Sequence, residues 1–280
     1  MLRESIKKLF AQTDIQLNKH WGQNFLISQK IAQKFADLAE LTKEDIILEI
    51  GPGLGIITKY LASQAKKVIA VEKDKRLIPF LRNNLKGVSK IKIINADIRN
   101  LLKNKEFWEI EELKHYKIVA NLPFYLSTFF LRKVFELKYK PKLMVLGLQQ
   151  EIVKRILAKP PKMSFLGMMT RLYGLPEPGP IVKKENFWPR PKVDAQILVI
   201  REIQEPKDLD AKQFLAFVKQ GFLHPRKKLL GNLSKELRIK KMAIKELFEK
   251  IGLSDNTRAQ ELGVEEWKKI WKEAKELTKE

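Results

Sequence analysis

The 280-residue chain contains no cysteine and only three histidines. The absence of cysteine excludes disulfide frameworks, cysteine-ligated zinc, iron–sulfur clusters and thiol catalysis. Three histidines are too few for a histidine-rich metal cluster, and we expect no metal site. No apolar run approaches the roughly 20 residues of a transmembrane helix, and the first ten residues are too charged for a signal-peptide core. We therefore expect a cytoplasmic, monomeric protein with no membrane partner.

Acidic residues are also scarce relative to basic ones. The chain has 55 lysines and arginines against 33 aspartates and glutamates, a formal net charge of +22. Much of the excess lies in two stretches, with 12 basic and 3 acidic residues over 138–192 and 9 basic and 1 acidic over 219–245. A solvated lysine coat is the alternative, but the clustering favours a polyanionic partner such as nucleic acid.

Short apolar runs alternate with helical patterns from about residue 43 to 201. Strands are predicted over 46–50, 67–71, 91–94, 116–120, 143–148 and 195–201, with helices between the earlier ones. This order is typical of an α/β fold whose parallel sheet is covered on both faces. Beyond residue 206 only helical patterns occur, and helices are predicted over 209–223, 227–237, 242–251 and 264–277. We expect one domain over 1–205, whose first 42 residues form an arm and a helix, and a small helical domain over 206–280.

A glycine-rich turn follows the first predicted strand, in the sequence E-I-G-P-G-L-G at 49–55. Glycines there let the backbone approach a ligand closely beyond the strand ends. The spacing lacks the third glycine of a dinucleotide fingerprint, and the chain has no G-x-x-x-x-G-K-[ST] phosphate loop. The turn therefore favours neither NAD nor a nucleoside triphosphate.

Carboxylates end the next two predicted strands. Glu72, about 20 residues beyond the glycines, could accept both ribose hydroxyls of a nucleoside cofactor. Asp97 could accept a hydrogen bond from an adenine amino group, although it could equally be a helix N-cap. With Gly51 and Gly53, these side chains at successive strand ends predict a pocket for S-adenosylmethionine in a Rossmann-like class I methyltransferase.

The fourth predicted strand ends in Asn121, Leu122, Pro123 and Phe124. An exocyclic adenine amine is a poor nucleophile because its lone pair is delocalised into the ring. The Asn121 side-chain oxygen and the Leu122 carbonyl could accept its two hydrogens and direct the lone pair at a methyl group. Phe124 would offer a stacking face to a base taken out of its helix.

These motifs together resemble the ribosomal RNA adenine N6,N6-dimethyltransferase family, in particular the bacterial members that dimethylate two adjacent adenosines near the 3′ end of 16S rRNA. The resemblance spans W-G-Q-N-F-L at 21–26, N-L-P-F at 121–124, F-W-P-R-P-K-V-D at 187–194 and F-L-H-P-R-K-K at 222–228. It implies S-adenosylmethionine as cofactor and the small ribosomal subunit or its precursor as partner. Phe124 stands where bacterial members usually carry tyrosine.

The resemblance also assigns roles to individual residues. Cofactor binding falls to Asn24, Leu26, Gly51, Glu72, Asp97 and Asn121. Phe187 would stack on the second face of the target adenine, opposite Phe124, and RNA binding falls to Arg226, Lys227 and Lys228. Three other hypotheses stay open: a 23S rRNA dimethyltransferase of the macrolide-resistance type, an assembly factor whose binding role outweighs methylation, and a DNA adenine methyltransferase.

Overall fold

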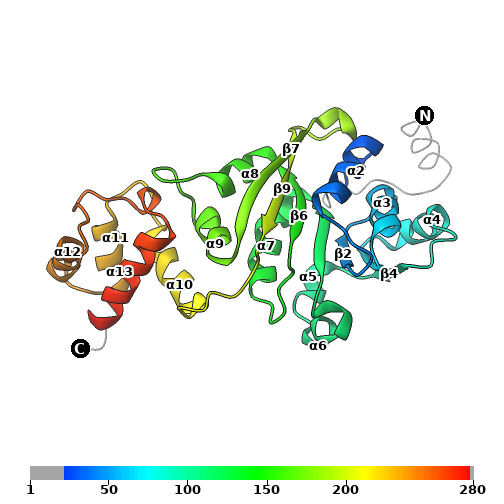
Figure 1. The fold of residues 1–280 in the computed structure, drawn as a ribbon. Helices are drawn as coiled ribbons and strands as arrows, with labels where there is room; N and C mark the ends of the chain where they lie inside the picture. Colours follow the sequence, from blue (N-terminus) through cyan, green and yellow to red (C-terminus); the bar gives the residue numbers. More distant parts are fainter. Residues whose placement is uncertain (1–21, 278–280) are drawn as a thin grey trace. The chain divides into compact units, whose positions relative to one another are not determined.

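A computed structural model describes residues 22–277 of the chain, so the arm expected over 1–42 is seen only from Gly22 onward and residues 1–21 lie outside the described part. The chain forms two compact units (Figure 1). The first comprises residues up to 153 together with 176–203, and the second comprises 154–175 together with 204 onward. The second unit thus takes in residues 154–175, which the sequence analysis placed in the first domain.

A seven-stranded sheet forms the centre of the first unit, in the order β4-β3-β2-β5-β6-β9-β7. Its strands are β2 (Ile46–Ile50), β3 (Lys67–Glu72), β4 (Ile91–Asn95), β5 (Lys117–Asn121), β6 (Met144–Gln149), β7 (Leu175–Val182) and β9 (Ala195–Arg201). Strands β4, β3, β2, β5 and β6 pair in parallel, whereas β9 pairs antiparallel with β6. The expectation of a wholly parallel sheet is therefore wrong for β9.

Helices cover the sheet and connect its strands. The first unit contains α2 (Gln29–Leu38), α3 (Ile56–Gln64), α4 (Ile78–Asn84), α5 (Ile98–Leu101), α6 (Lys105–Glu109), α7 (Ser127–Phe135) and the start of α8 (Gln150–Leu157). Short 3-10 turns η2 (Lys75–Leu77), η3 (Glu111–Leu113), η4 (Phe124–Leu126) and η5 (Lys184–Asn186) lie between them. The α/β class expected from the alternating pattern is confirmed.

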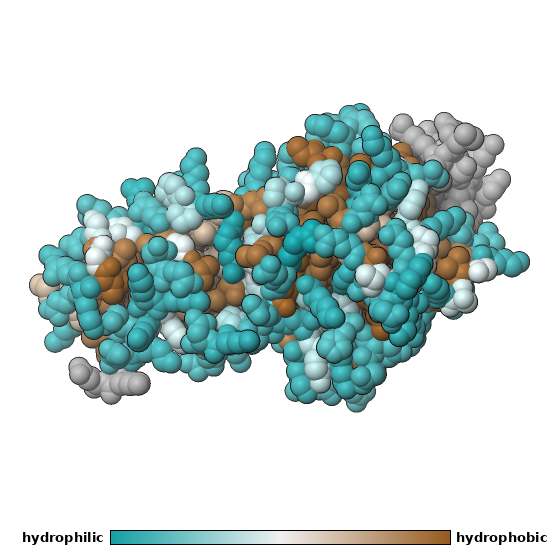
Figure 2. Space-filling view, in the orientation of Figure 1, coloured by the Kyte–Doolittle hydropathy of each residue, from teal (hydrophilic) through white to brown (hydrophobic). Residues whose placement is uncertain are grey.

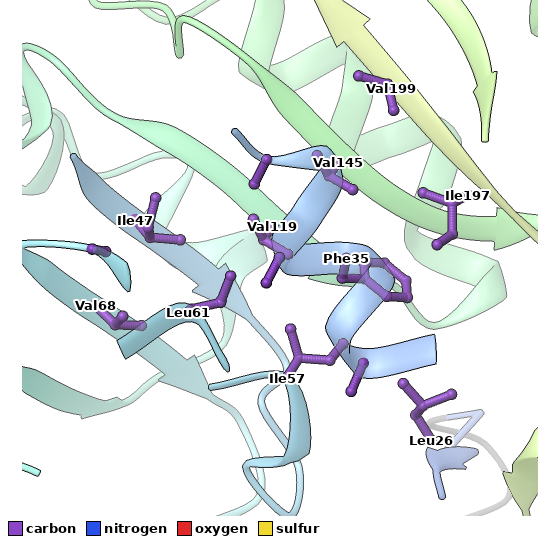
Figure 3. Close-up of a cluster of buried hydrophobic side chains, with 14 of the residues drawn as sticks. Leu26, Phe35, Ile47, Ile57, Leu61, Val68, Val119, Val145, Ile197 and Val199 are labelled. Carbon is purple, nitrogen blue, oxygen red and sulfur yellow. The ribbon is translucent and has the colours of Figure 1, made fainter. Parts of the chain in front are cut away.

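The pleat of the strands sends alternate side chains to opposite faces. Helices α2 and α3 cover one face, where Phe35 of α2 lies among Val119, Val145 and Ile197 (Figure 3). The residues that alternate with these along the strands, such as Leu48, are equally buried on the opposite face. Burial on both sides explains why these strands read as continuous apolar runs.

The strand order reverses between β2 and β5, because the chain moves outward from β2 through β3 and β4 and then returns to β5. Connections leave the carboxyl ends of β2 and β5 in opposite directions, which opens a crevice there. The glycine turn follows β2 and the Asn121 motif ends β5, so the fold brings these two motifs to the same crevice.

Two features of the first unit were not predicted. Strand β7 carries Pro176, Pro178 and Pro180, residues that normally argue against a strand. Their period of two places all three missing N–H groups on one side of the strand, which suits its place at the sheet edge. The second feature is a separate two-stranded antiparallel sheet of β1 (Phe25–Leu26) and β8 (Phe187–Trp188).

The second unit is helical. It contains α9 (Phe165–Tyr173), α10 (Ala211–Gly221), α11 (Leu229–Leu237), α12 (Lys241–Lys250), η6 (Ala259–Glu261) and α13 (Val264–Leu277). The fully buried Trp267 of α13 lies at its centre, stacked on Phe222 with ring centroids 5.7 Å apart. All four helices predicted beyond residue 206 are present. None of the helices in the described part of the chain combines the length and apolar character that a membrane span requires, and the face in Figure 2 is largely hydrophilic.

Two helical glycines of the second unit should respond in opposite ways to alanine. A Cβ at Gly221 would lie 2.3 Å from Cη2 of Trp267 and 2.8 Å from Cδ1 of Leu229, so Gly221→Ala should destabilise the unit by about 1–3 kcal/mol through overpacking. Gly231 has nothing within 4 Å of such a Cβ. Gly231→Ala should therefore stabilise α11 by about 0.4–1 kcal/mol. Urea unfolding followed by tryptophan fluorescence measures both, and equal midpoints would contradict the packing.

Candidate active site

A pocket opens at the carboxyl ends of β2 and β5. Glycines, an acid, aromatic rings and one amide share its walls: Asn24, Leu26, Gly51, Gly53, Glu72, Asn121, Leu122, Pro123, Phe124 and Phe187 are all among its lining residues. A second pocket shares Gln23, Gly51, Glu72 and Pro123 with it and extends to Asp97. The two pockets thus adjoin, and their walls bring together every cofactor and catalytic residue named from the sequence.

The glycine turn gives this site its floor. Gly51, Gly53 and Gly55 all have positive φ, at 68°, 56° and 79°, a conformation that glycine adopts without strain. A Cβ at Gly53 would come within 3.0 Å of Phe25, whereas one at Gly51 would meet nothing within 4 Å. The backbone at Gly51 therefore faces open space in the pocket, where a ligand can approach it.

Glu72 ends β3 at the junction of the two pockets. Its side chain is 7% exposed, and its two oxygens accept hydrogen bonds from Gly53 N at 3.1 Å and Asp74 N at 2.8 Å. Burial raises the pKa of Glu72, while these backbone N–H groups act to lower it. The bonds fix the carboxylate in orientation, and each oxygen keeps a lone pair for a ligand hydroxyl.

Asp74 links Glu72 to the N-terminal segment, and the sequence analysis missed it. Its carboxylate accepts a hydrogen bond from Gln23 Nε2 at 2.9 Å and pairs with Arg76 at 2.8 Å. Burial acts to raise the pKa of Asp74, but the bonds from Arg76 and Gln23 outweigh it and lower the pKa. An aspartate two residues after a strand resembles an ordinary cap, and it does cap η2. No sequence signal marked the long-range bond to Gln23.

Asp97 lines the second pocket and is also the N-cap of α5, accepting from Arg99 N at 2.9 Å. Arg99 Nη2 lies 2.6 Å and Lys73 Nζ 3.2 Å from the same carboxylate. Partial burial acts to raise the pKa of Asp97, yet the hydrogen bonds from Arg99 and Lys73 lower it to about 2. The cap and cofactor interpretations of Asp97 are thus compatible in space, although two cations compete for its oxygens.

The Asn121 motif lies on the opposite wall. Asn121 ends β5, and Leu122 N donates to Gly147 O at 3.1 Å, which anchors the turn to β6. A Cβ at Gly147 would lie 2.6 Å from Asn121 Oδ1, so the absence of a side chain there gives the amide room. Among the described residues, neither the Asn121 amide nor the Leu122 carbonyl has a hydrogen-bonding partner, which leaves both free to bind a substrate amine.

The β1–β8 sheet closes the pocket. Leu26 pairs with Phe187, and Ile27 N donates to Asn186 O at 2.8 Å beside them. Asn24 and Leu26, assigned to the cofactor, and Phe187, assigned to the target base, therefore sit on two paired strands. Leu26 and Phe187 also join the core cluster beneath α2. Strands of two residues are too short for a periodic signal, which is why the sequence did not predict them.

Comparisons with known proteins agree with this geometry. The sequence profile of the ribosomal RNA adenine dimethylase family matches residues 15–276. The chain belongs to this family. It is 36% identical over 271 residues to ribosomal RNA small subunit methyltransferase A of Dehalococcoides mccartyi, covering 96% of this chain and 92% of the relative. The protein of the same name from Clostridium botulinum is 34% identical over 269 residues, covering 94% and 96%.

Solved structures show the fold. A dimethyladenosine transferase from Plasmodium falciparum superposes with a TM-score of 0.76 at 21% identity, over 90% of this chain and 98% of that one. The 23S rRNA methyltransferase ErmE gives a TM-score of 0.71 at 24% identity, over 89% and 99%. These likenesses confirm the Rossmann-like class I methyltransferase fold of the dimethylase.

The dimethylase also buries an acid that the sequence analysis did not assign. Glu49 of β2 lies on the face of the sheet that α2 and α3 cover, and it is 1% exposed. Its Oε2 is buried without a hydrogen-bonding partner among the described residues, and the Thr58 hydroxyl is buried near the carboxyl group. Burial raises the pKa of Glu49 to about 8, with a smaller contribution from the charge of Glu72. Glu49 is therefore mostly protonated at neutral pH.

This buried acid should make the dimethylase less stable as the pH rises. Because the pKa of Glu49 is higher in the folded chain than the ordinary 4.5, the folded state binds more protons than the unfolded state between those values. The stabilisation is full below about pH 4.5 and is lost as the pH rises through about 8. Glu49→Gln, which cannot ionise, should flatten this dependence between pH 6 and pH 9 in thermal unfolding. Parallel pH profiles for the two proteins would contradict the assignment.

Proposed function

We propose that this dimethylase transfers methyl groups from S-adenosylmethionine to N6 of two adjacent adenosines near the 3′ end of 16S rRNA, in the small ribosomal subunit or its precursor. The observation that carries the proposal is the place of Asn121, Leu122, Pro123 and Phe124. They form one wall of a pocket whose other walls carry Gly51 and Glu72. The curated relatives bear names that refer to the small ribosomal subunit.

The pocket suits S-adenosylmethionine in shape and chemistry. The open space at Gly51 would admit the amino-acid part, and Glu72 would accept the ribose hydroxyls at the junction of the two pockets. Asp97 would take the adenine amine, exchanging one of its present cationic donors for it. Asn24 and Leu26 would cover the cofactor from β1. When bound, the cofactor supplies an electrophilic methyl group on a sulfonium.

The residues of the β5 wall would prepare the nucleophile. In the first transfer the Asn121 amide oxygen and the Leu122 carbonyl would accept the two N6 hydrogens of the target adenine, and the nitrogen lone pair would then point away from the ring plane toward the methyl group. In the second transfer one hydrogen remains for these acceptors, and each transfer releases one N6 proton and S-adenosylhomocysteine. Their acceptor strength matters most as positive charge develops on N6, which is transition-state stabilisation. Fixing the amine in line with the methyl removes much of the entropic cost.

Two aromatic rings would hold the flipped base. Phe124 is half-buried and Phe187 is 4% exposed, and both line the pocket that contains Asn121. A base removed from its stack needs apolar faces to replace its neighbours. Phenylalanine lacks the hydroxyl of the tyrosine that is usual at position 124, but stacking requires only the ring.

The alternatives differ in substrate rather than in chemistry. The 23S rRNA hypothesis is not favoured, because the curated relatives that match over most of both chains refer to the small subunit. Nucleoside mass spectrometry after incubation with each purified ribosomal subunit tests the choice. Dimethyladenosine is expected in 16S rRNA, and its appearance in 23S rRNA alone would overturn the proposal. A purely binding role predicts no dimethyladenosine in either.

Replacing the catalytic amide should separate chemistry from binding. Asn121→Ala removes one acceptor that acts mainly as charge develops, so the activation free energy should rise by about 2–4 kcal/mol and turnover should fall roughly 30- to 900-fold. Affinity for S-adenosylhomocysteine in calorimetry should change little, because Glu72 and the glycine turn remain. Turnover close to that of the unchanged protein would remove Asn121 from the chemistry.

RNA docking is assigned to the second unit. Arg226, Lys227 and Lys228 are exposed in the loop before α11. Buried Asn232 holds this loop by donating to Gly221 O at 3.0 Å and His224 O at 2.9 Å. A fixed loop can therefore present three cations to phosphates, which set the register of a complex without reading sequence.

Charge reversal of these three residues should weaken RNA binding and flatten its salt dependence. Each lost phosphate contact should reduce the slope of log affinity against log salt by roughly 0.7–0.9. S-Adenosylhomocysteine affinity should be unchanged, because its pocket belongs to the first unit. The matched control is charge reversal of Lys75, an exposed lysine of η2. If the triple variant keeps the original slope, the basic stretch over 138–192 becomes the docking surface.

A further inference from the structure

Tyr125 is an exposed aromatic residue beside the catalytic motif that none of the roles above uses. It follows Phe124 in η4, and its side chain is 49% exposed. While Phe124 lines the pocket that holds Asn121, Tyr125 lines the second pocket, together with Asp97, Ile98 and Leu126. Phe124 and Tyr125, which are consecutive in η4, thus line the two adjoining pockets.

The ring lies at the pocket rim. It packs beside Gly22, where a Cβ would be 3.8 Å from Cδ1 of Tyr125 and 3.9 Å from Cβ of Pro123. The Tyr125 phenol also makes a minor electrostatic contribution to the raised pKa of Arg99, after the hydrogen bonds and charge of Asp97. Arg99 is itself held on Asp97. Tyr125 thus lies beside the N-terminal segment and lines the same pocket as Asp97 and Ile98 at the start of α5.

The walls of this second pocket suit a flat, apolar ring with a polar edge. Val71, Ile98 and Leu126 supply apolar surface, and Asp97 supplies an acceptor. A purine that fills such a pocket would leave its outer face in water unless another ring covers it. A half-exposed tyrosine at the mouth can provide that cover at low entropic cost, since its ring has only two rotatable bonds.

We infer that Tyr125 closes the adenine end of the cofactor pocket and binds the adenine of S-adenosylmethionine by ring contact. The inference rests on the proposed function, which places the cofactor ribose on Glu72. It assigns the two aromatic residues of η4 to different bases, Phe124 to the target adenine and Tyr125 to the cofactor adenine. Stacking of Tyr125 on an RNA base that flanks the target is the competing role.

Calorimetry with two ligands tests the assignment. S-Adenosylhomocysteine carries the whole cofactor skeleton, and 5′-methylthioadenosine lacks its amino-acid part. Tyr125→Ala should weaken both ligands by the same factor, about tenfold for one lost aromatic contact. Tyr125→Phe should bind both within about twofold of the unchanged protein, because the ring and not the hydroxyl makes the contact. Tyr139→Ala, a tyrosine that precedes β6 at the other end of the sheet, is the matched control and should change neither affinity.

Fluorescence at position 125 distinguishes direct contact with the ligand from an indirect effect of the substitution on the structure. Tyr125→Trp keeps an aromatic ring at the pocket mouth, and the additional fluorescence should be quenched when S-adenosylhomocysteine is added. Far-ultraviolet circular dichroism and thermal unfolding confirm that each variant is folded. Absence of quenching, together with full affinity of Tyr125→Ala, would overturn the inference.

The outcomes separate this inference from the proposed function. Failure of the unchanged protein to bind S-adenosylhomocysteine would contradict the cofactor proposal itself. Equal affinities for the unchanged protein and Tyr125→Ala would leave the cofactor proposal standing and overturn the role of Tyr125. Unchanged cofactor affinity with a raised KM for rRNA would assign the ring to a flanking RNA base, and would also overturn the inference.

Discussion

The buried carboxylate of Glu72 is the interaction on which the site depends. One oxygen holds the glycine turn through Gly53 N, and the other holds Asp74 N. Asp74 in turn binds Gln23, which leads directly into β1. A single acid at the end of β3 therefore ties the floor of the pocket to the segment that covers it. Burial works against its charge, and the two backbone donors offset that cost and orient the oxygens.

The β1–β8 pairing extends this chain of contacts to the substrate side. Leu26 and Phe187 are register partners, so the strand assigned to the cofactor and the strand assigned to the target base share one backbone ladder. Phe25 and Trp188, the other pair, pack with Leu54 of the glycine turn and Leu77 of η2. A displacement of β1 would move Phe187 as well. The two strands, and the residues assigned to cofactor and base, are thus coupled by their backbone pairing.

Most of the fold could be predicted because its signals are local. The strand 46–50 and the helix 264–277 have the predicted bounds, since long periodic apolar runs specify elements strongly. Strand β7 escaped prediction because its three prolines read as a loop, and only its position at the sheet edge makes them acceptable. The pairing of β1 with β8 joins residues more than 150 positions apart, and neither strand is long enough to show a pattern.

The site was predictable to the extent that each motif lies at a strand end. Four strands end at or just before these residues: β2 before Gly51, β3 at Glu72, β4 before Asp97 and β5 at Asn121. Adjacent parallel strands bring their carboxyl ends together. The role of Asp74 depends on a hydrogen bond across 51 residues, and the burial of Glu49 depends on α3 covering that face of the sheet. Such facts come from packing, which a single sequence does not specify.

Charge in the pocket would help a strongly basic protein to keep RNA phosphates out of the proposed cofactor site. Three other acids in or near the pocket are neutralised in different ways: Asp74 by Arg76, Asp97 by Arg99 and Lys73, and Glu49 by its raised pKa. Glu72 has no cationic partner among the described residues, and its oxygens accept only from backbone N–H groups. A carboxylate at the junction of the two pockets repels phosphate and attracts a sulfonium cation. Under the proposed function, the basic residues would attract RNA while the pocket would select a cationic cofactor and an uncharged base.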